Sequence, residues 1–284
     1  MPRPPRVWLD LVNKLNFGCG RRIAEGWTNI DFHSDDARVL RANLLSGFPF
    51  PDRHFDVVYS SHVLEHFTPA QGASLIKESW RVLKPGGIVR IVVPDLEAIC
   101  REYLRILALD DCDPCKLPLY NWSKIELLDQ LVRSKPRGLM GPLSDSVLDG
   151  DDEKMIAYVH SRTESQALSA TTVARTNGIG RIKRITRQKI ATRLIYYYLA
   201  VVKSLIPKNL LDMVFNGTSV GEKHRWMYDG YGMNILMEAN GFANIRIVAF
   251  NESEIIGFNS DYLDSNADGT PYKNVSLYCE AIKP

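Results

Sequence analysis

Short apolar runs and one amphipathic stretch alternate along the first hundred residues of the chain. Residues 15–17, 28–30, 55–61 and 88–93 are rich in β-branched and aromatic side chains, which favours strands that are covered on both faces. Residues 69–83 place apolar side chains at helical spacing, and Lys84-Pro85-Gly86-Gly87 ends that pattern. Strands that alternate with helices predict an α/β fold with a doubly wound parallel sheet, in which ligands bind at the carboxyl ends of the strands.

The turn after the first of these strands is rich in glycine. Because Gly18 and Gly20 have no Cβ, the backbone can turn sharply there and a ligand can approach closely. Asp31 ends the second strand, where a carboxylate can accept hydrogen bonds from two ribose hydroxyls. An NAD-type dehydrogenase is the weaker interpretation, because its fingerprint has a third glycine that opens a helix, whereas Arg21-Arg22-Ile23 follows here.

Several motifs together resemble the class I S-adenosylmethionine-dependent methyltransferases, and within them the type 11 kind that acts on small molecules. The motifs are residues 15–20, Asp31, residues 55–61, residues 62–66 and residues 81–87. Two further stretches, residues 221–229 and 239–242, are similar to a subgroup often encoded beside glycosyltransferases of polysaccharide biosynthesis. The resemblance covers about residues 13–105 and 220–284.

The resemblance implies a particular fold. It implies a seven-stranded, mostly parallel, Rossmann-like sheet of strand order 3-2-1-4-5-7-6, with residues 243–250 and 275–283 as the last two strands. The methyltransferase core would then comprise residues 1–107 and 221–284. Residues 108–220 would form a largely helical insertion after the fifth strand, over the cofactor at the carboxyl end of the sheet.

The resemblance also implies where S-adenosylmethionine binds. The backbone of Gly18, Cys19 and Gly20 would line its methionine portion, and Asp31 would hold its ribose. Asn16 stands where many relatives carry an acid that meets the methionine ammonium group. Asn43 and Leu44 occupy the place of the residues that flank adenine, while Ser60, Ser61 and His62 would lie beneath the sulfonium.

Transfer of the methyl group needs an aligned acceptor and, for a hydroxyl acceptor, a base. The candidate bases are His62, Asp95 and His224, since histidine titrates closest to neutral pH. In the same cluster as His224, Arg225 could hold a phosphate or carboxylate, and Trp226 or Tyr228 could stack on a sugar ring. Alternatively, Trp226 and Met227 are core residues and His224 caps a helix.

Three other side chains carry two interpretations each. Cys19 is either a small apolar filler, which we favour, or a reactive thiol. Glu65 and His66 either begin a helix or take part in catalysis. His62 and His66 could suggest a metal site, but two histidines without a third ligand are poor evidence, so no metal is expected.

Composition is that of an ordinary globular protein. The chain has 284 residues, 45% of them hydrophobic, and a net charge of +2, which does not favour nucleic acid as a partner. Five cysteines, with only Cys112 and Cys115 closely spaced, are typical of a reducing cytoplasm. The first residues lack the apolar core of a signal peptide. We therefore expect a cytoplasmic protein; no pattern predicts its oligomeric state.

Residues 165–211 contain nine Lys or Arg and no Asp or Glu. Their apolar run, residues 194–202, is far shorter than the ~20 residues that span a bilayer. Three interpretations stay open: a helical lid over the substrate, a helix at about 181–206 that rests on anionic lipid at the inner membrane face, or a basic clamp for a phosphorylated substrate.

These features favour a methyltransferase that transfers a methyl group in line to a hydroxyl of a sugar or glycan-related acceptor. The preference for a sugar comes from the resemblance. The alternatives are methylation of another small molecule or lipid-linked substrate, and a cofactor-binding regulatory module without catalysis.

Overall fold

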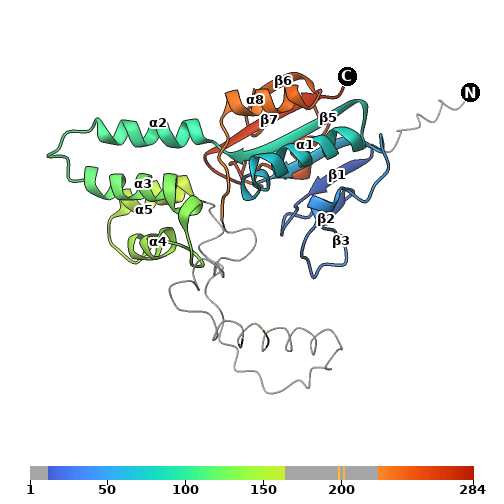
Figure 1. Cartoon of the computed structure of the whole chain (residues 1–284). Helices are drawn as coiled ribbons and strands as arrows, with labels where there is room; N and C mark the ends of the chain where they lie inside the picture. Colours follow the sequence, from blue (N-terminus) through green and yellow to red (C-terminus); the bar gives the residue numbers. More distant parts are fainter. Residues whose placement is uncertain (1–11, 164–197, 199–200, 202–222) are drawn as a thin grey trace, which may run out of the picture.

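Seven strands form one sheet in the computed structural model, which describes residues 12–163, 198, 201 and 223–284 (Figure 1). The strands are β1 (Lys14–Phe17), β2 (Thr28–Asp31), β3 (Val39–Arg41), β4 (Phe55–Ser61), β5 (Leu83–Pro94), β6 (Ala243–Val248) and β7 (Ser276–Ile282). Their order across the sheet is β3-β2-β1-β4-β5-β7-β6, as the sequence predicts.

The strand directions correct one part of the prediction. The pairs β1–β2, β2–β3, β1–β4 and β4–β5 are parallel, whereas β7 runs antiparallel to both β5 and β6. The description "mostly parallel" therefore holds for the first five strands and is wrong for the pairings of β7. α1 ends at Val82, just before Lys84-Pro85-Gly86-Gly87, as the sequence predicts, and β5 already begins at Leu83, so these four residues belong to the strand.

Two helices cover one face of the sheet. The helix α1 (Pro69–Val82) begins at a capping box in which Thr68 and Gln71 bond to each other's backbone N–H groups. Leu75 and Ile76 of α1 belong to the same core cluster as Met233 and Met237 of α8 (Gly230–Ala239). This apolar layer fixes the ends of β1 and β4, from which the site described below is built.

A loop segment packs on the opposite face. Trp27, just before β2, and Tyr59, in β4, pack against Phe258 and Leu263. Phe258 begins the short helix η4 (Phe258–Asp261), and Leu263 follows it. The described part of this face is thus covered by residues between β6 and β7. The doubly wound pattern expected from the sequence is replaced there by a loop that carries aromatic side chains.

Helices follow β5 and extend away from the sheet (Figure 1). They are α2 (Leu96–Leu107), α3 (Lys116–Val132), α4 (Met140–Leu148) and α5 (Glu153–Arg162). Backbone N–H of His224 donates to the Gln130 carbonyl at 2.9 Å, which ties α3 to the segment before α8. The helices α3–α5 make up the described part of the predicted insertion at 108–220. The division into a core of residues 1–107 and 221–284 and an insertion of residues 108–220 stays a prediction.

The segment expected at a membrane surface, about residues 181–206, lies outside the described residues except for Tyr198 and Val201. Among helices of the described residues, none combines the length and the apolar character required to cross a bilayer.

A buried arginine joins β5 to the segment that covers the second face. Arg90 is fully buried, and its guanidinium contacts Asp264 at 2.6 Å and Glu280 at 2.7 Å. Asp264 also accepts a hydrogen bond from the Tyr59 hydroxyl at 2.5 Å. Because one arginine balances two buried carboxylates, its removal would leave Asp264 without a cationic partner and Glu280 with only the more distant Arg246, at 3.7 Å.

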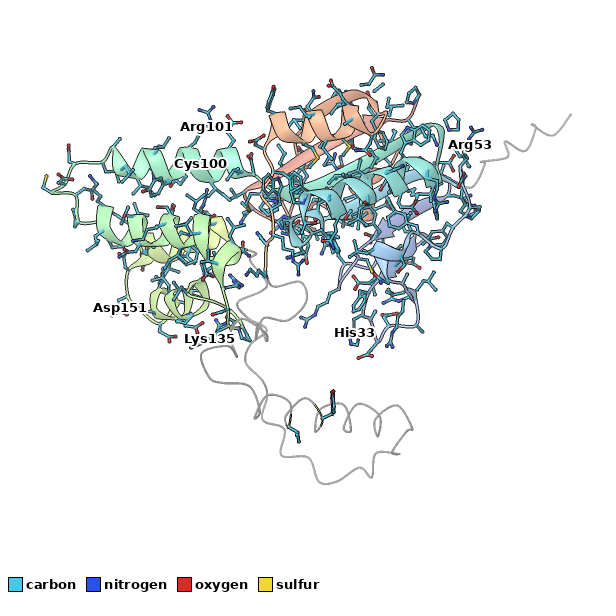
Figure 2. The ribbon with its side chains drawn as sticks, viewed as in Figure 1. His33, Arg53, Cys100, Arg101, Lys135 and Asp151 are labelled. Atoms are coloured by element: carbon cyan, nitrogen blue, oxygen red, sulfur yellow. The ribbon has the colours of Figure 1, made fainter. Side chains whose placement is uncertain are left out.

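We predict that Arg90→Met lowers the free energy of unfolding by about 3–5 kcal/mol, because it removes the one cation that contacts both buried carboxylates, Asp264 and Glu280, at ion-pair distance. Urea unfolding measures this loss. The control is Arg101→Met, since Arg101 forms an exposed pair with Glu97 and points away from the protein (Figure 2), where the expected loss is about 0–1 kcal/mol. Equal losses in the two variants would contradict the assignment.

Candidate functional site

A cavity of about 150 Å³ lies at the carboxyl ends of β1 and β4. One wall is the glycine loop and the ends of the strands, and the other is the segment that precedes β7. The lining residues are Asn16, Gly18, Cys19, Gly20, Arg21, Arg22, Tyr59, Ser61, His62, Leu263, Tyr272 and Lys273. Six of the residues predicted to bind the cofactor therefore line one cavity: Asn16, Gly18, Cys19, Gly20, Ser61 and His62.

Gly18 packs against the chain that follows β4. Its φ is +65°, and its N–H donates to the Ile30 carbonyl at 2.8 Å. A Cβ at this position would lie 2.3 Å from Cγ2 of Val63 and 3.2 Å from its Cβ. Only glycine fits here, since both the backbone conformation and the space exclude a side chain.

Asp31 holds the other end of the glycine loop. Its Oδ2 accepts a hydrogen bond from the Gly20 N–H at 2.9 Å, and its Oδ1 accepts one from the His33 N–H at 3.0 Å. Each carboxylate oxygen keeps further acceptor capacity. The carboxylate is thus fixed beside the loop, in the position from which it could also accept bonds from hydroxyls of a ligand.

Asn16 and Cys19 have structural roles in the cavity wall. The Asn16 amide is buried and donates to the Arg22 carbonyl and to Asn29 Oδ1, both at 2.9 Å. Burial, reinforced by the charge of Asp31, raises the pKa of the Cys19 thiol to about 12. The thiol is therefore protonated at neutral pH, which favours the filler interpretation over the reactive one.

Four predicted cofactor residues lie outside the lining. Asp31 is one of them, although it bonds to Gly20, which does line the cavity. Asn43 uses its side-chain oxygen to accept from the Leu45 N–H at 3.1 Å, where it caps η1 (Leu44–Ser46). Leu44 is a core residue, and the Ser60 hydroxyl is buried without a hydrogen-bond partner among the described residues.

Sequence reasoning missed the second wall of the cavity. Arg22 stacks on the Tyr272 ring at 4.0 Å, and its guanidinium donates to the carbonyls of Tyr262 and Ser265. Tyr272 and Lys273 come from an irregular segment without apolar periodicity. The only sign of this wall in the sequence was the pair Arg21-Arg22 after the glycine turn, because long cationic side chains there can reach a distant segment of the chain.

A buried polar cluster adjoins the cavity at His62. The φ of His62 is +53°, a strained conformation for a non-glycine residue, and its Nε2 lies 2.8 Å from the Ser276 hydroxyl. Its Nδ1 lies 3.4 Å from Oε1 of Glu65, and Nε2 of His66 lies 3.8 Å from the same oxygen. His62 and His66 thus both face Glu65.

Burial dominates the protonation of this cluster. It raises the pKa of the Glu65 carboxyl to about 7 and lowers the pKa of the His62 imidazole well below its usual value. Burial together with the neighbouring His66 lowers the pKa of His224 to about 3. The histidines are therefore neutral at neutral pH.

The segment before α8 completes the cluster. The N–H groups of Arg225 and Trp226 donate to the Glu65 carbonyl at 2.6 and 3.2 Å, and the His224 ring lies 5.1 Å from that of His66. His224 is buried rather than a helix cap, since Asp229 caps α8 by accepting from the Gly232 N–H. The alternative that made His224 a cap is therefore wrong.

The predicted substrate side chains are spread over the surface and the core. Arg225 is exposed and Trp226 is 48% exposed, so Trp226 is not a core residue. Tyr228 is buried, and its hydroxyl has no hydrogen-bond partner among the described residues. Trp226 is thus available for stacking, whereas Tyr228 faces inward. Burial, with a smaller contribution from the Glu65 charge, raises the pKa of the Tyr228 hydroxyl to about 12.

Asp95, the third predicted base, caps a helix. Its Oδ1 accepts from the Ala98 N–H at 3.1 Å at the start of α2, and the residue does not line the cavity. Its backbone pairs with Tyr228, so it lies beside the cluster. A catalytic role of Asp95 stays a prediction.

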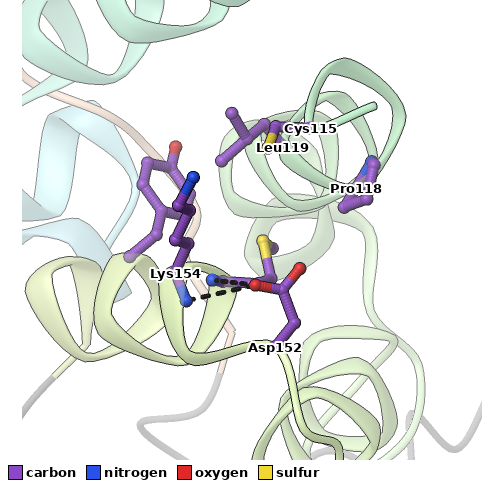
Figure 3. A pocket seen from close by; sticks show the side chains of 7 residues that line it. Cys115, Pro118, Leu119, Asp152 and Lys154 are labelled. Atoms are coloured by element: carbon purple, nitrogen blue, oxygen red, sulfur yellow. Dashed lines mark hydrogen bonds between the residues drawn. The ribbon is translucent and has the colours of Figure 1, made fainter. Parts of the chain in front are cut away.

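A separate cavity of about 230 Å³ lies between α3 and α5 (Figure 3). Its lining is largely apolar and includes Leu119, Met155 and Tyr158. Asp152 is committed to capping α5, since its Oδ1 accepts from the N–H groups of Lys154 and Met155 at 3.1 Å. We therefore place the candidate chemistry at the glycine loop, where backbone N–H groups, a carboxylate and imidazoles converge.

Comparisons with known proteins agree with this part of the fold. Residues 22–91, from the end of the glycine loop into β5, match a family model described as a methyltransferase domain. A Synechocystis protein named "Uncharacterized methyltransferase sll0829" is 47% identical over 49 residues. That match covers 17% of this chain and 23% of the relative, so this chain aligns with about a quarter of the relative's length.

Solved structures of S-adenosylmethionine-dependent methyltransferases are also similar. One from Archaeoglobus fulgidus is 11% identical, with 96% of this chain and 86% of that chain covered and a TM-score of 0.36. One from Mesorhizobium loti is 15% identical, with 95% and 90% covered and a TM-score of 0.36. Scores at this level carry no argument about the function of this chain.

We predict that Gly18→Ala destabilises the protein more than Gly26→Ala. Gly26 also has a positive φ, +76°, but no atom lies within 4 Å of a Cβ there. Both variants incur about 1–2 kcal/mol for the left-handed backbone, and the contact with Val63 adds about 1–3 kcal/mol to Gly18→Ala. Chemical unfolding measures the difference. The account requires that adding Val63→Ala recovers part of the Gly18→Ala loss; a double variant no better than the single one would contradict it.

Proposed function

We propose that this chain is an S-adenosylmethionine-dependent methyltransferase that methylates a hydroxyl of a sugar or glycan-related acceptor. The observation that carries the proposal is the glycine loop, whose Gly18 leaves no room for a side chain and whose Gly20 is bonded to Asp31. The match of residues 22–91 to a methyltransferase domain supports the same assignment.

The residues present fit this cofactor. Gly20 lines the cavity, and no described atom lies within 4 Å of a Cβ built on it, so a ligand can approach the backbone closely there. Asp31 has acceptor capacity for ribose hydroxyls. Ser61 and His62, at the end of β4, would lie near the methyl group. When bound, the cofactor supplies a methyl group already activated on a sulfonium.

The protein's own task is then alignment and removal of a proton. An acceptor oxygen held roughly 3 Å from the methyl carbon and in line with the carbon–sulfur bond forms the new bond. Transfer of the methyl group would leave the electron pair of the carbon–sulfur bond on sulfur, and a base of the protein would take the hydroxyl proton. We assign that base to His62, because it lines the cavity and its imidazole is neutral.

The exposed indole of Trp226 supports an acceptor with a sugar ring. Trp226 is two residues after the buried His224, and its backbone N–H donates to the Glu65 carbonyl at 3.2 Å, so an exposed indole is attached to backbone that borders the cluster. An aromatic face can stack on the apolar face of a pyranose. The neighbouring exposed Arg225 is suited to a phosphate, as in a nucleotide-linked or lipid-linked sugar.

We predict that the chain binds S-adenosylhomocysteine and does not bind NAD, as measured by isothermal titration calorimetry. Asp31→Asn should weaken binding about 10-fold or more, because a neutral amide replaces the charged acceptor for the ribose. The matched control is Asp35→Asn, since Asp35 is exposed and pairs with Arg41. If S-adenosylhomocysteine gives no heat of binding, the proposed function is wrong. If it binds but no acceptor is methylated, the chain is a cofactor-binding module without catalysis.

The sugar acceptor calls for a test in cells. We expect glycans from cells lacking the gene to lose one methyl group by mass spectrometry. Re-expression of the wild-type chain or of Asp35→Asn should restore it, and Asp31→Asn should restore less. If glycan methylation is unchanged and a lipid or another small molecule loses a methyl group, the sugar acceptor is wrong and the methyltransferase activity still stands.

A further inference from the structure

Three potential metal ligands from distant parts of the chain meet beside the glycine-loop cavity. Ligand atoms of Glu65, His66 and His224 all lie within 4.8 Å of one another. Glu65 and His66 belong to η2 (Leu64–His66), and the hydrogen bonds from Arg225 and Trp226 to the Glu65 carbonyl bring His224 to them. The sequence offered two histidines without a third ligand; the fold places His224 beside them.

The Glu65 side chain has no hydrogen-bond partner among the described residues. Glu65 is fully buried, and neither carboxylate oxygen accepts a hydrogen bond within the described part of the chain. His224 is 3% exposed, and its Nδ1 likewise has no hydrogen-bond partner there. A buried carboxylate without hydrogen bonds is costly to keep charged, and a bound cation would offset that cost.

Two positively charged side chains act on this cluster. Arg133 is a buried guanidinium that contributes positive potential at His66 and His224, and it is itself paired with Asp129 at 2.6 Å. Lys273 also adds positive potential, so a bound ion would have to outweigh both.

The orientation of His66 is that of a metal ligand. Its Nδ1 lies 3.1 Å from the Lys223 carbonyl, which can only accept, so Nδ1 carries the proton. The unprotonated Nε2 then faces Glu65 Oε1 at 3.8 Å. A backbone carbonyl that fixes the tautomer of a histidine in this way is typical of metal sites.

We propose that Glu65, His66 and His224 bind one divalent first-row transition-metal ion, with Zn²⁺ as the expected occupant. Two imidazole nitrogens and one carboxylate oxygen form the ligand set of catalytic zinc sites, which keep a further position for water or substrate. Ligand distances of about 2.0–2.2 Å require the three side chains to close on the ion by small rotations.

The role of the ion in catalysis rests on the proposed function. His62 lines the cavity and lies 3.4 Å from Glu65, so the ion would lie next to the acceptor hydroxyl. A Lewis acid at that point lowers the pKa of a hydroxyl and stabilises the charge that develops as the proton leaves. The substrate class is then an acceptor whose oxygen, or a neighbouring oxygen, can approach a metal ion.

The test is equilibrium dialysis of the chelator-treated full chain against Zn²⁺, with Co²⁺ substitution followed by visible absorption. We expect one ion per chain and a Co²⁺ spectrum with nitrogen and oxygen ligands. Glu65→Gln, His66→Ala and His224→Ala should each weaken binding by roughly 100-fold or more. The controls are His160→Ala, on the exposed face of α5, and Cys115→Ser, which removes the alternative cysteine pair.

The outcomes separate this proposal from the proposed function. Absence of a bound ion, or an affinity that Glu65→Gln leaves unchanged, overturns the metal site, and binding of S-adenosylhomocysteine by the same preparation then still supports the methyltransferase. If one Zn²⁺ binds per chain but S-adenosylhomocysteine does not bind, the metal site is confirmed and its role in methyl transfer is wrong. Glu65→Gln is nearly isosteric, so circular dichroism that matches the wild type shows that a loss of metal is not a loss of fold.

Discussion

The close contact between Gly18 and Val63 is the constraint on which the site depends. The backbone at the end of β1 passes so near the chain after β4 that a methyl group would lie 2.3 Å from Val63. Asp31 holds the same loop from the neighbouring strand through Gly20. These contacts bring the carboxyl ends of β1 and β4 to one cavity, with the end of β2 hydrogen-bonded to its glycine loop, and the glycines line it with backbone alone.

A second constraint holds the opposite wall. The buried Arg90 binds Asp264, and Asp264 accepts from Tyr59, so the segment before β7 is tied to β4 and β5. Tyr272 and Lys273 reach the cavity from that segment. The unpaired Glu65 lies next to this frame, with neutral imidazoles around it. The wall is thus held by buried ion pairs, whereas the Glu65 carboxyl beside it has no hydrogen-bond partner among the described residues.

Much of the fold was predictable from the sequence because its signals are local. The apolar runs predicted the strands, the resemblance implied their order, and the predicted neighbours Gly20 and Asp31 are hydrogen-bonded. The antiparallel pairing of β7 and the aromatic loop that covers the described part of the second face depend on how distant residues pack. The helix cap formed by Asn43 was likewise not predicted, and its contact with adenine stays a prediction.

The sequence singled out Glu65 and His224 separately, and only the tertiary structure brings them together. His224 and Glu65 are separated by the whole helical region, so no spacing rule could pair them. Burial also changes their chemistry: the low pKa of His224 and the raised pKa of Glu65 come from the loss of solvent around them. A histidine was expected to have the pKa closest to neutral pH, whereas in this cluster the Glu65 carboxyl has a pKa of about 7 and His224 one of about 3.

The most direct measurement is a crystal structure of the chain with S-adenosylhomocysteine. The account predicts the thioether sulfur in the cavity beside Gly18 and Ser61, with both ribose hydroxyls on the Asp31 carboxylate. A ligand bound elsewhere, or one whose ribose makes no contact with Asp31, would contradict it.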